Sequence, residues 1–158
     1  MKEINFLSKL LREEKLKIIE PSEELKISYI RKSESNLDSS KILLKNNKLE
    51  ESITFTYYSM YHILTALLFK IGIKCENHTG SIILIKLLFG IDNSEMFSAK
   101  KERVDKQYYT DFKITKEEII VSLKDTEKFN SLILDFISKL TNEEIARYRE
   151  KFYEIVKK

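Results

Sequence analysis

Glycine and proline are scarce in this chain, which has three glycines and one proline in 158 residues. A β-sandwich needs many tight turns, and a phosphate-binding loop needs glycines where the backbone approaches its ligand closely. The composition argues against both. Hydrophobic residues make up 42% of the chain and charged residues 34%, which is too apolar for a disordered segment. We therefore expect an almost purely helical globular protein.

Apolar residues recur at helical spacing along nearly the whole sequence. The pattern predicts helices over about residues 2–19, 22–45, 48–71, 81–89, 92–109 and 115–140, and a last one after Thr141. The link at 73–80 is expected to be a loop. Short connections between long helices favour antiparallel neighbours. The predicted fold class is all-α, an up-and-down helical bundle of about five to seven helices.

Residues that cap helices mark the expected ends of these segments. Three capping boxes are predicted, in which Asn47 pairs with Glu50, Thr115 with Glu118 and Thr141 with Glu144. Gly72 and Gly90 each follow an apolar run, the position where glycine commonly ends a helix. We find no internal repeat and no linker, so residues 1–158 are expected to form one domain.

The segment from Ile53 to Phe69 carries no formal charge. Its many hydroxyl groups and His62 make it a poor membrane span, and a helix at the centre of a bundle explains it better. The preceding segment places small residues such as Ser33 and Ser40 in its apolar stripe. We expect the next helix to pack closely there.

The charge balance is 28 basic against 25 acidic residues, a net charge of +3. This excess is too small to imply a protein dominated by phosphate contacts. It falls in residues 100–116, which form either a solvated helix face or an edge that faces an anion or RNA. With Cys75 as the sole cysteine and no signal-peptide pattern at the start, a cytoplasmic location is expected.

Few residues in the sequence could carry chemistry. His62, His78 and Cys75 are the only imidazoles and thiol, and their spacing does not suit a metal site, so neither a metal nor another cofactor is expected. Tyr58 and His62 are four residues apart and share one helix face. His62 is either an ordinary core residue or a group that exchanges protons near neutral pH, and the sequence leaves both open.

The run Tyr57–His62, followed by Gly72 and then His78 and Gly80, resembles the HEPN domain family, and more narrowly its stand-alone members of the UPF0332 type. That group also carries a later helix with an arginine, then an acidic or amide residue and a tyrosine. Here the corresponding stretch is Arg103–Tyr108. The resemblance covers about residues 22–140, with the terminal helices as additions.

The resemblance implies a helical bundle that forms a homodimer. Many members pair with a small nucleotidyltransferase, often as toxin and antitoxin, and several are metal-independent ribonucleases. The ribonucleases have an arginine followed within a few residues by a histidine. Arg103 matches that arginine, but Tyr108 stands five residues on and no histidine follows. Tyrosine, with a pKa of about 10, is a poor proton acceptor at neutral pH.

Three hypotheses stay open at this point. The first is a homodimeric partner of a small nucleotidyltransferase that binds a nucleotide or RNA, with contacts from Tyr58, Tyr61, Lys100, Arg103, Lys106 and Tyr108. The second is a metal-independent ribonuclease in which Arg103 acts with His62 or His78. The third is a structural bundle in which the tyrosine and histidine cluster is only part of the core. The first is favoured because the motif histidine is missing.

Overall fold

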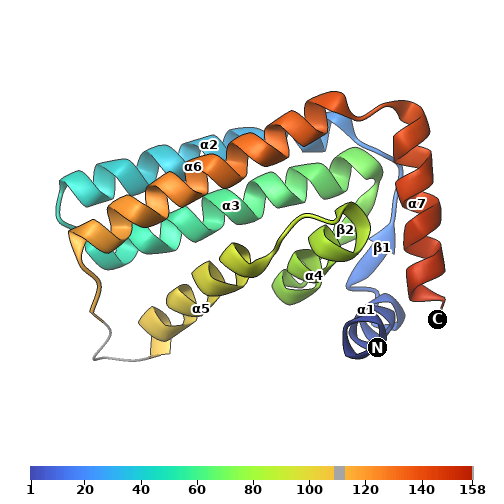
Figure 1. Cartoon of the computed structure of the whole chain (residues 1–158), viewed down its shortest axis with the longest axis horizontal. Helices are drawn as coiled ribbons and strands as arrows, with labels where there is room; N and C mark the ends of the chain where they lie inside the picture. The colour runs from blue at the N-terminus through green and yellow to red at the C-terminus, as the bar shows by residue number, and fades with distance from the viewer. Residues whose placement is uncertain (109–112, 158) are drawn as a thin grey trace.

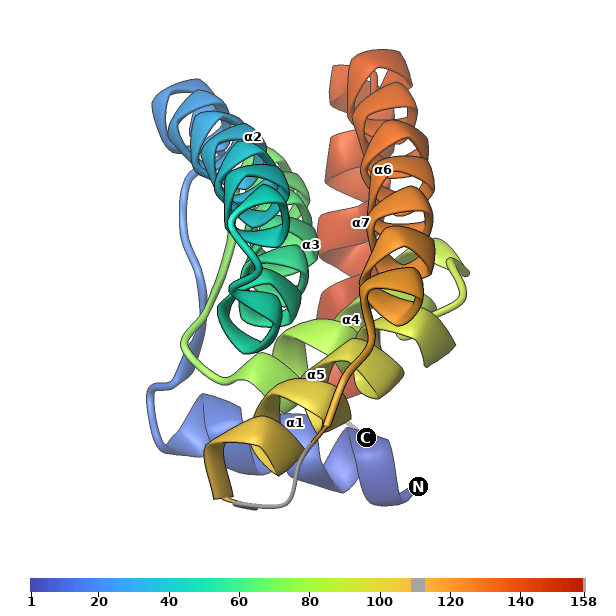
Figure 2. The ribbon, with the colours of Figure 1, turned by 90° about the vertical axis from the view of Figure 1, so that its left-hand side faces the viewer.

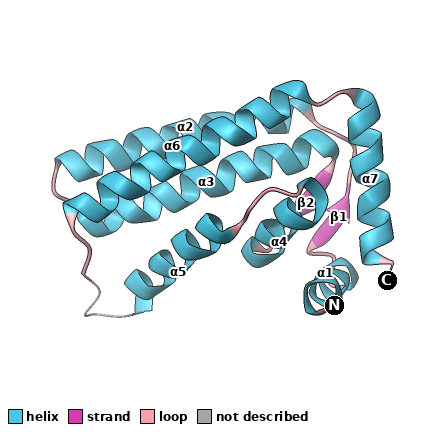
Figure 3. Cartoon of the chain, in the orientation of Figure 1, coloured by secondary structure: helices cyan, strands magenta, loops and turns pink. Residues whose placement is uncertain are grey.

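The computed structural model describes residues 1–108 and 113–157, with only the backbone described for residues 105–108. Within these ranges the protein has seven helices and two very short strands (Figure 1, Figure 3). In chain order they are α1 (Lys2–Arg12), β1 (Leu16–Ile18), α2 (Glu23–Lys45), α3 (Leu49–Ile71), β2 (Ile73–Cys75), α4 (His78–Phe89), α5 (Ser94–Tyr108), α6 (Lys116–Lys139) and α7 (Asn142–Val156). The predicted all-α helical bundle is confirmed.

The three longest helices, α2, α3 and α6, run side by side along the molecule (Figure 1). Viewed along that direction, α2 and α3 lie on one side and α6 and α7 on the other, with α1, α4 and α5 beneath them (Figure 2). Helix α3 contacts α2, α4, α5, α6, α7 and β2. It is therefore the central helix that its uncharged sequence predicts.

Helices α2 and α3 are held by two reciprocal serine pairs. Ser40 and Ser52 each donate a hydrogen bond from Oγ to the other's carbonyl oxygen, at 2.9 and 2.8 Å. Ser33 and Ser59 do the same at 2.7 and 2.8 Å, and all four residues are buried. The expected close packing of these helices is confirmed. The small residues of α2 meet small residues of α3 at both places.

The α1 segment differs from its predicted range of about 2–19. The helix ends at Arg12, Glu14 adopts a left-handed backbone with φ 57°, and the chain continues as β1. This strand pairs antiparallel with β2, and Ile18 lies opposite Ile73. Leu16 and Ile73 are fully buried. Three-residue strands are too short to show an alternating pattern, which is why periodicity did not reveal them.

The helix starts are confirmed at two of the three predicted capping boxes. The side chains of Thr115 and Thr141 accept hydrogen bonds from the backbone amides of Glu118 and Glu144. The carboxylates of these glutamates accept in turn from the backbone amides of the two threonines. The Asn47 box is wrong, because Asn47 adopts φ 60° in the turn after α2 and Lys48 occupies the N-cap of α3. The left-handed region suits asparagine.

Helix α4 begins at His78, three residues before the predicted start. Asn77 is its N-cap, with the side-chain oxygen accepting from the amide of Gly80 at 2.8 Å. The prediction that the link at 73–80 is a loop is therefore wrong at both ends, since β2 occupies 73–75 and α4 starts at 78.

In the described part of the chain, none of the helices is both long and apolar enough to cross a bilayer.

Gly72 ends α3 at a point where the chain also contacts Ile19, just after β1, and Arg149 of α7. It adopts φ 79° in a left-handed cap, and its carbonyl oxygen accepts from the amide of Ile19 at 2.9 Å. Arg149 of α7 donates from Nη1 to the carbonyl oxygens of Ile19 and Ile71, both at 2.8 Å. A Cβ atom at position 72 would overlap this guanidinium and the Ile19 carbonyl oxygen.

We predict that Gly72→Ala destabilises the protein far more than Gly90→Ala. Gly90 also ends a helix with positive φ, 69°, but nothing lies within 4 Å of an added Cβ. The Gly90 variant should lose about 1 kcal/mol for the strained backbone alone. The Gly72 variant should lose at least about 3 kcal/mol because the Arg149 contacts are displaced as well. Urea denaturation measures both, and equal losses would contradict the role assigned to Arg149.

Candidate functional site

The half-buried side of α3 carries the tyrosines and histidine that the sequence singles out. Most of the α3 circumference is fully buried, including Tyr57. Tyr58, Tyr61, His62 and Thr65 are half-buried and follow each other at spacings of three, one and three residues. Such spacing places them on one side of the helix. Helices α4 and α5 bring His78 and Arg103 to this cluster.

Arg103 contacts both tyrosines at the centre of the cluster. Its Nη1 donates to the hydroxyl oxygen of Tyr58 at 3.0 Å. Its guanidinium carbon lies 5.0 Å from the ring centroid of Tyr57 and 5.5 Å from that of Tyr58. These distances are within the range of a cation–π interaction, which half-burial strengthens. Nε of Arg103 is buried and has no hydrogen-bond partner within the described part of the chain.

His78 is linked to Arg103 through Tyr57. The Tyr57 hydroxyl lies 2.6 Å from Nδ1 of His78. Tyr61 covers one face of the His78 imidazole. The two rings stack with their centroids 3.9 Å apart and an interplanar angle of 5°. His78 is thus held at one ring nitrogen and along one ring face, and its orientation is fixed by two residues of α3.

His62 is linked to Arg103 through Tyr58. The rings of Tyr58 and His62 stack with their centroids 6.0 Å apart. The ring centroid of Tyr29, on α2, lies 5.7 Å from that of His62. The side-chain nitrogen of Asn36 lies 2.7 Å from Nδ1 of His62. An amide nitrogen only donates, so Nδ1 accepts and the proton of the neutral imidazole is on Nε2.

The environment keeps both imidazoles neutral at physiological pH. Burial, followed by the positive charges of Arg103 and Lys100, lowers the pKa of His78 from 6.5 to about 4. As the first residue of α4, His78 also lies at the positive end of the helix dipole. Burial, followed by the charge of Lys32, lowers the pKa of His62. The positive charge around the cluster therefore comes from Arg103 and Lys100 beside His78 and from Lys32 beside His62.

The neighbouring hydroxyl and thiol groups stay protonated. Burial raises the pKa of Tyr57 well above its usual value of 10, and it raises the pKa of Tyr61 as well. When the protonated Tyr57 hydroxyl donates to Nδ1 of His78, Nε2 of that imidazole holds the proton. Burial also raises the pKa of Cys75, which disfavours the thiolate that a nucleophilic cysteine requires.

The structure brings together most of the residues predicted from sequence. Arg103, Tyr58, Tyr61, His62 and His78 form one connected cluster, and Lys100 acts on it through its charge. Lys106 and Tyr108 lie near the end of α5, where the side chains are outside the described part of the structure. Across the residues that are described, no three potential ligands among His, Cys, Asp and Glu converge on a metal position.

Sequence reasoning did not assign roles to three residues that shape the site. Tyr57 connects Arg103 with His78, while Asn36 and Tyr29 fix His62 from α2. Asn36 could have been suspected, because it is a polar residue one turn after Ser33 on the face that meets α3. Nothing in the local sequence distinguishes Tyr57 from the tyrosine beside it.

Comparisons with known proteins agree with this architecture. Residues 27–158, which take in most of α2 and everything after it, match the family model of the HEPN domain. A 61-residue stretch is 43% identical to the UPF0332 protein PH1297 of Pyrococcus horikoshii. That alignment covers 39% of this chain and 43% of the relative, so it spans less than half of either protein.

We predict that folded-state stability declines as the pH falls from about 6.5 towards 4, and that His78 causes much of the decline. Its pKa is about 4 in the folded protein and about 6.5 in the unfolded chain, so the unfolded chain binds the proton first and gains stability. The urea midpoint of His78→Gln should therefore fall less between pH 7 and pH 5 than that of the unmodified protein. An identical fall in both proteins would contradict the lowered pKa.

Proposed function

The chain belongs to the HEPN domain family, and on that premise we propose that the cluster around Arg103 binds the phosphate of a nucleotide or of RNA. The observation that carries the proposal is the setting of Arg103. Two tyrosines hold its guanidinium in place, with Nη1 donating to Tyr58 and Nε without a hydrogen-bond partner in the described part of the chain. A fixed guanidinium suits phosphate oxygens, which it can bind with two parallel hydrogen bonds.

Lys100 and the neutral histidines support an anionic ligand. Lys100 lies one turn before Arg103 on α5, and both charges act on His78. A bound phosphate would offset these charges and so raise the pKa of His78 towards its usual value. Half-buried Tyr58 and Tyr61 provide aromatic surface beside the cations, as proteins that bind single-stranded nucleic acid do. The net charge of +3 favours a short contact over an extended RNA surface.

The biological setting that we propose is that of many HEPN proteins, a homodimer that works with a small nucleotidyltransferase in a toxin–antitoxin-like pair. This part rests on the family resemblance. Co-expression with a nucleotidyltransferase encoded beside this gene, followed by affinity purification and light scattering, tests it. A stable complex that contains two copies of this chain supports the proposal, whereas a monomer that elutes alone contradicts it.

The alternative function is metal-independent cleavage of RNA, for which the connection between Arg103 and His78 is the specific support. Through Tyr57 they lie in one cluster, and a neutral imidazole can accept the proton of a ribose 2′-hydroxyl. A base with a pKa of about 4 is weak at neutral pH, which favours binding over catalysis. Cleavage of RNA in the presence of a chelator, lost in both Arg103→Ala and His78→Ala, would establish the alternative.

We predict that Arg103→Ala weakens binding of a fluorescently labelled nucleotide or short RNA by at least about tenfold, the effect of losing one charge-assisted contact. Fluorescence anisotropy at fixed ionic strength measures the affinity. Lys101→Ala is the matched control, because Lys101 lies in the same helix and is exposed, whereas Arg103 is half-buried in the cluster. The control should stay within about twofold of the unmodified protein. Equal losses in the two variants would show a diffuse charge effect and overturn the site.

A further inference from the structure

The hydrogen-bond partners of the two histidines in the Arg103 cluster determine which ring nitrogen carries the proton. The side-chain nitrogen of Asn36 lies 2.7 Å from Nδ1 of His62. Since an amide nitrogen donates, Nδ1 accepts, and the proton of this neutral imidazole is on Nε2. His62 therefore offers a ligand an N–H donor and no free lone pair.

His78 is held in the same way, with Tyr57 in place of Asn36. Tyr57 is fully buried, and its hydroxyl oxygen lies 2.6 Å from Nδ1 of His78. Within the described part of the chain this nitrogen is the hydroxyl's one hydrogen-bond partner. A buried hydroxyl that accepted from Nδ1 would have no acceptor for its own proton, so Tyr57 donates and Nε2 of His78 holds the ring proton.

Tyr58 and Arg103 add further donors beside the two imidazoles. The Tyr58 hydroxyl accepts from Nη1 of Arg103, and its own proton has no acceptor among the described residues. The ring centroids of His62 and His78 lie 6.0 and 6.5 Å from that of Tyr58, and the guanidinium carbon of Arg103 lies 5.5 Å from it. All four groups are thus within reach of one ligand of nucleotide size.

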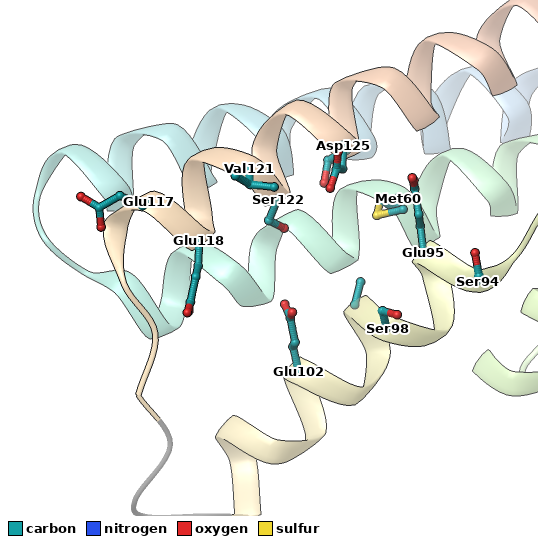
Figure 4. Close-up of a pocket in the computed structure, with 12 residues that line it drawn as sticks. Met60, Ser94, Glu95, Ser98, Glu102, Glu117, Glu118, Val121, Ser122 and Asp125 are labelled. Carbon is teal, nitrogen blue, oxygen red and sulfur yellow. The ribbon is translucent and has the colours of Figure 1, made fainter.

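The charges around these donors favour a ligand that accepts. The charged side chains that act on the two imidazoles are the cations Arg103, Lys100 and Lys32. Figure 4 shows Glu95 and Glu102, the carboxylates of α5 whose side chains are described, pointing towards α6, where they line a groove between the two helices. Helix α5 therefore presents cations to the cluster and carboxylates to α6.

Given the proposed phosphate-binding function, on which this inference rests, we propose that Asn36 and Tyr57 are positioning residues that hold both imidazoles as Nε2–H donors, so that the site recognises the phosphate of its ligand and not the base. Ionised phosphate oxygens accept and match these donors. The edge of a nucleobase mixes donors with acceptors, so part of it would meet N–H groups with its own N–H groups. With Nδ1 engaged and Nε2 protonated, neither imidazole has a free lone pair for the proton of a 2′-hydroxyl.

Nitrogen-15 NMR of the untagged full-length protein, labelled at histidine, tests the tautomers directly. A protonated ring nitrogen and an unprotonated one resonate in separate ranges, and the chain has two histidines to observe. At pH 7 both should show a protonated Nε2 and an unprotonated Nδ1. A proton on Nδ1 of either imidazole would overturn the proposal without any variant being needed.

Two substitutions test the positioning residues. Tyr57→Phe keeps the ring against Arg103 but removes the hydroxyl, so His78 should lose its preference for Nε2–H, and the affinity for AMP should fall about threefold or more. Asn36→Asp replaces the donor with an acceptor of the same shape and should move the His62 proton to Nδ1.

Tyr148→Phe is the matched control for Tyr57→Phe. Tyr148 is also half-buried or deeper, but its ring packs against Phe89 and Phe136. This variant should change neither tautomer nor the affinity for AMP. Unchanged tautomers in both Tyr57→Phe and Asn36→Asp would show that the two residues do not position the imidazoles.

Titration with ribose 5-phosphate, AMP, UMP and adenosine tests what is recognised. The three phosphates should bind within about threefold of one another, and adenosine at least about tenfold more weakly than AMP. Adenosine that binds as tightly as AMP would overturn recognition of the phosphate. Arg103→Ala separates the two proposals: if it binds AMP normally, the proposed function fails, whereas if it loses AMP while Tyr57→Phe keeps both affinity and tautomer, this inference alone fails.

Discussion

Burial of the central helix α3 on nearly all sides, together with its hydroxyl groups, is the constraint on which the rest of the structure depends. A helix such as α3, which is apolar around most of its circumference, must be surrounded by other elements. It is also rich in serine, threonine and tyrosine, whose hydroxyl groups lose water when they are buried. Each neighbouring helix therefore supplies hydrogen-bond partners as well as apolar contacts. The reciprocal bonds between Ser33 and Ser59 and between Ser40 and Ser52 show this for α2.

The same requirement explains where the site is. Asn130 of α6 donates to Ser59 at 2.9 Å and so joins a third helix to the serine pair. The half-buried side of α3 presents Tyr58, Tyr61 and His62, which find partners on α2, α4 and α5. Arg103 is fixed as one of those partners. Its position follows from the hydroxyl and ring groups of α3, so the candidate binding residue is oriented by the core rather than by a loop.

The sequence predicts the fold better than it predicts the site because the two depend on contacts of different range. Capping at Thr115 and Thr141 involves residues three apart, and the cap at Gly72 follows from the local chain. These were confirmed. The bonds of Tyr57 to His78 and of Asn36 to His62 join residues 21 and 26 positions apart on different helices. Helical periodicity indicates which side of a helix is buried, but not which residue it meets. The same limit explains why β1 and β2 were missed, since each three-residue strand pairs with a strand that lies far away in the sequence.

The hydrogen bonds of Arg149 have a consequence for the order in which the molecule can assemble. They join α7 to carbonyl groups that precede it by 130 and 78 residues, and Ser8 similarly donates to the carbonyl oxygen of Val156 across 148 residues. During synthesis the ribosome releases the α2–α3 hairpin, with its serine pairs, long before α7. The hairpin can form early from contacts between neighbours in sequence, whereas the end of the molecule that contains Gly72 and the two strands stays open until α7 emerges and closes it.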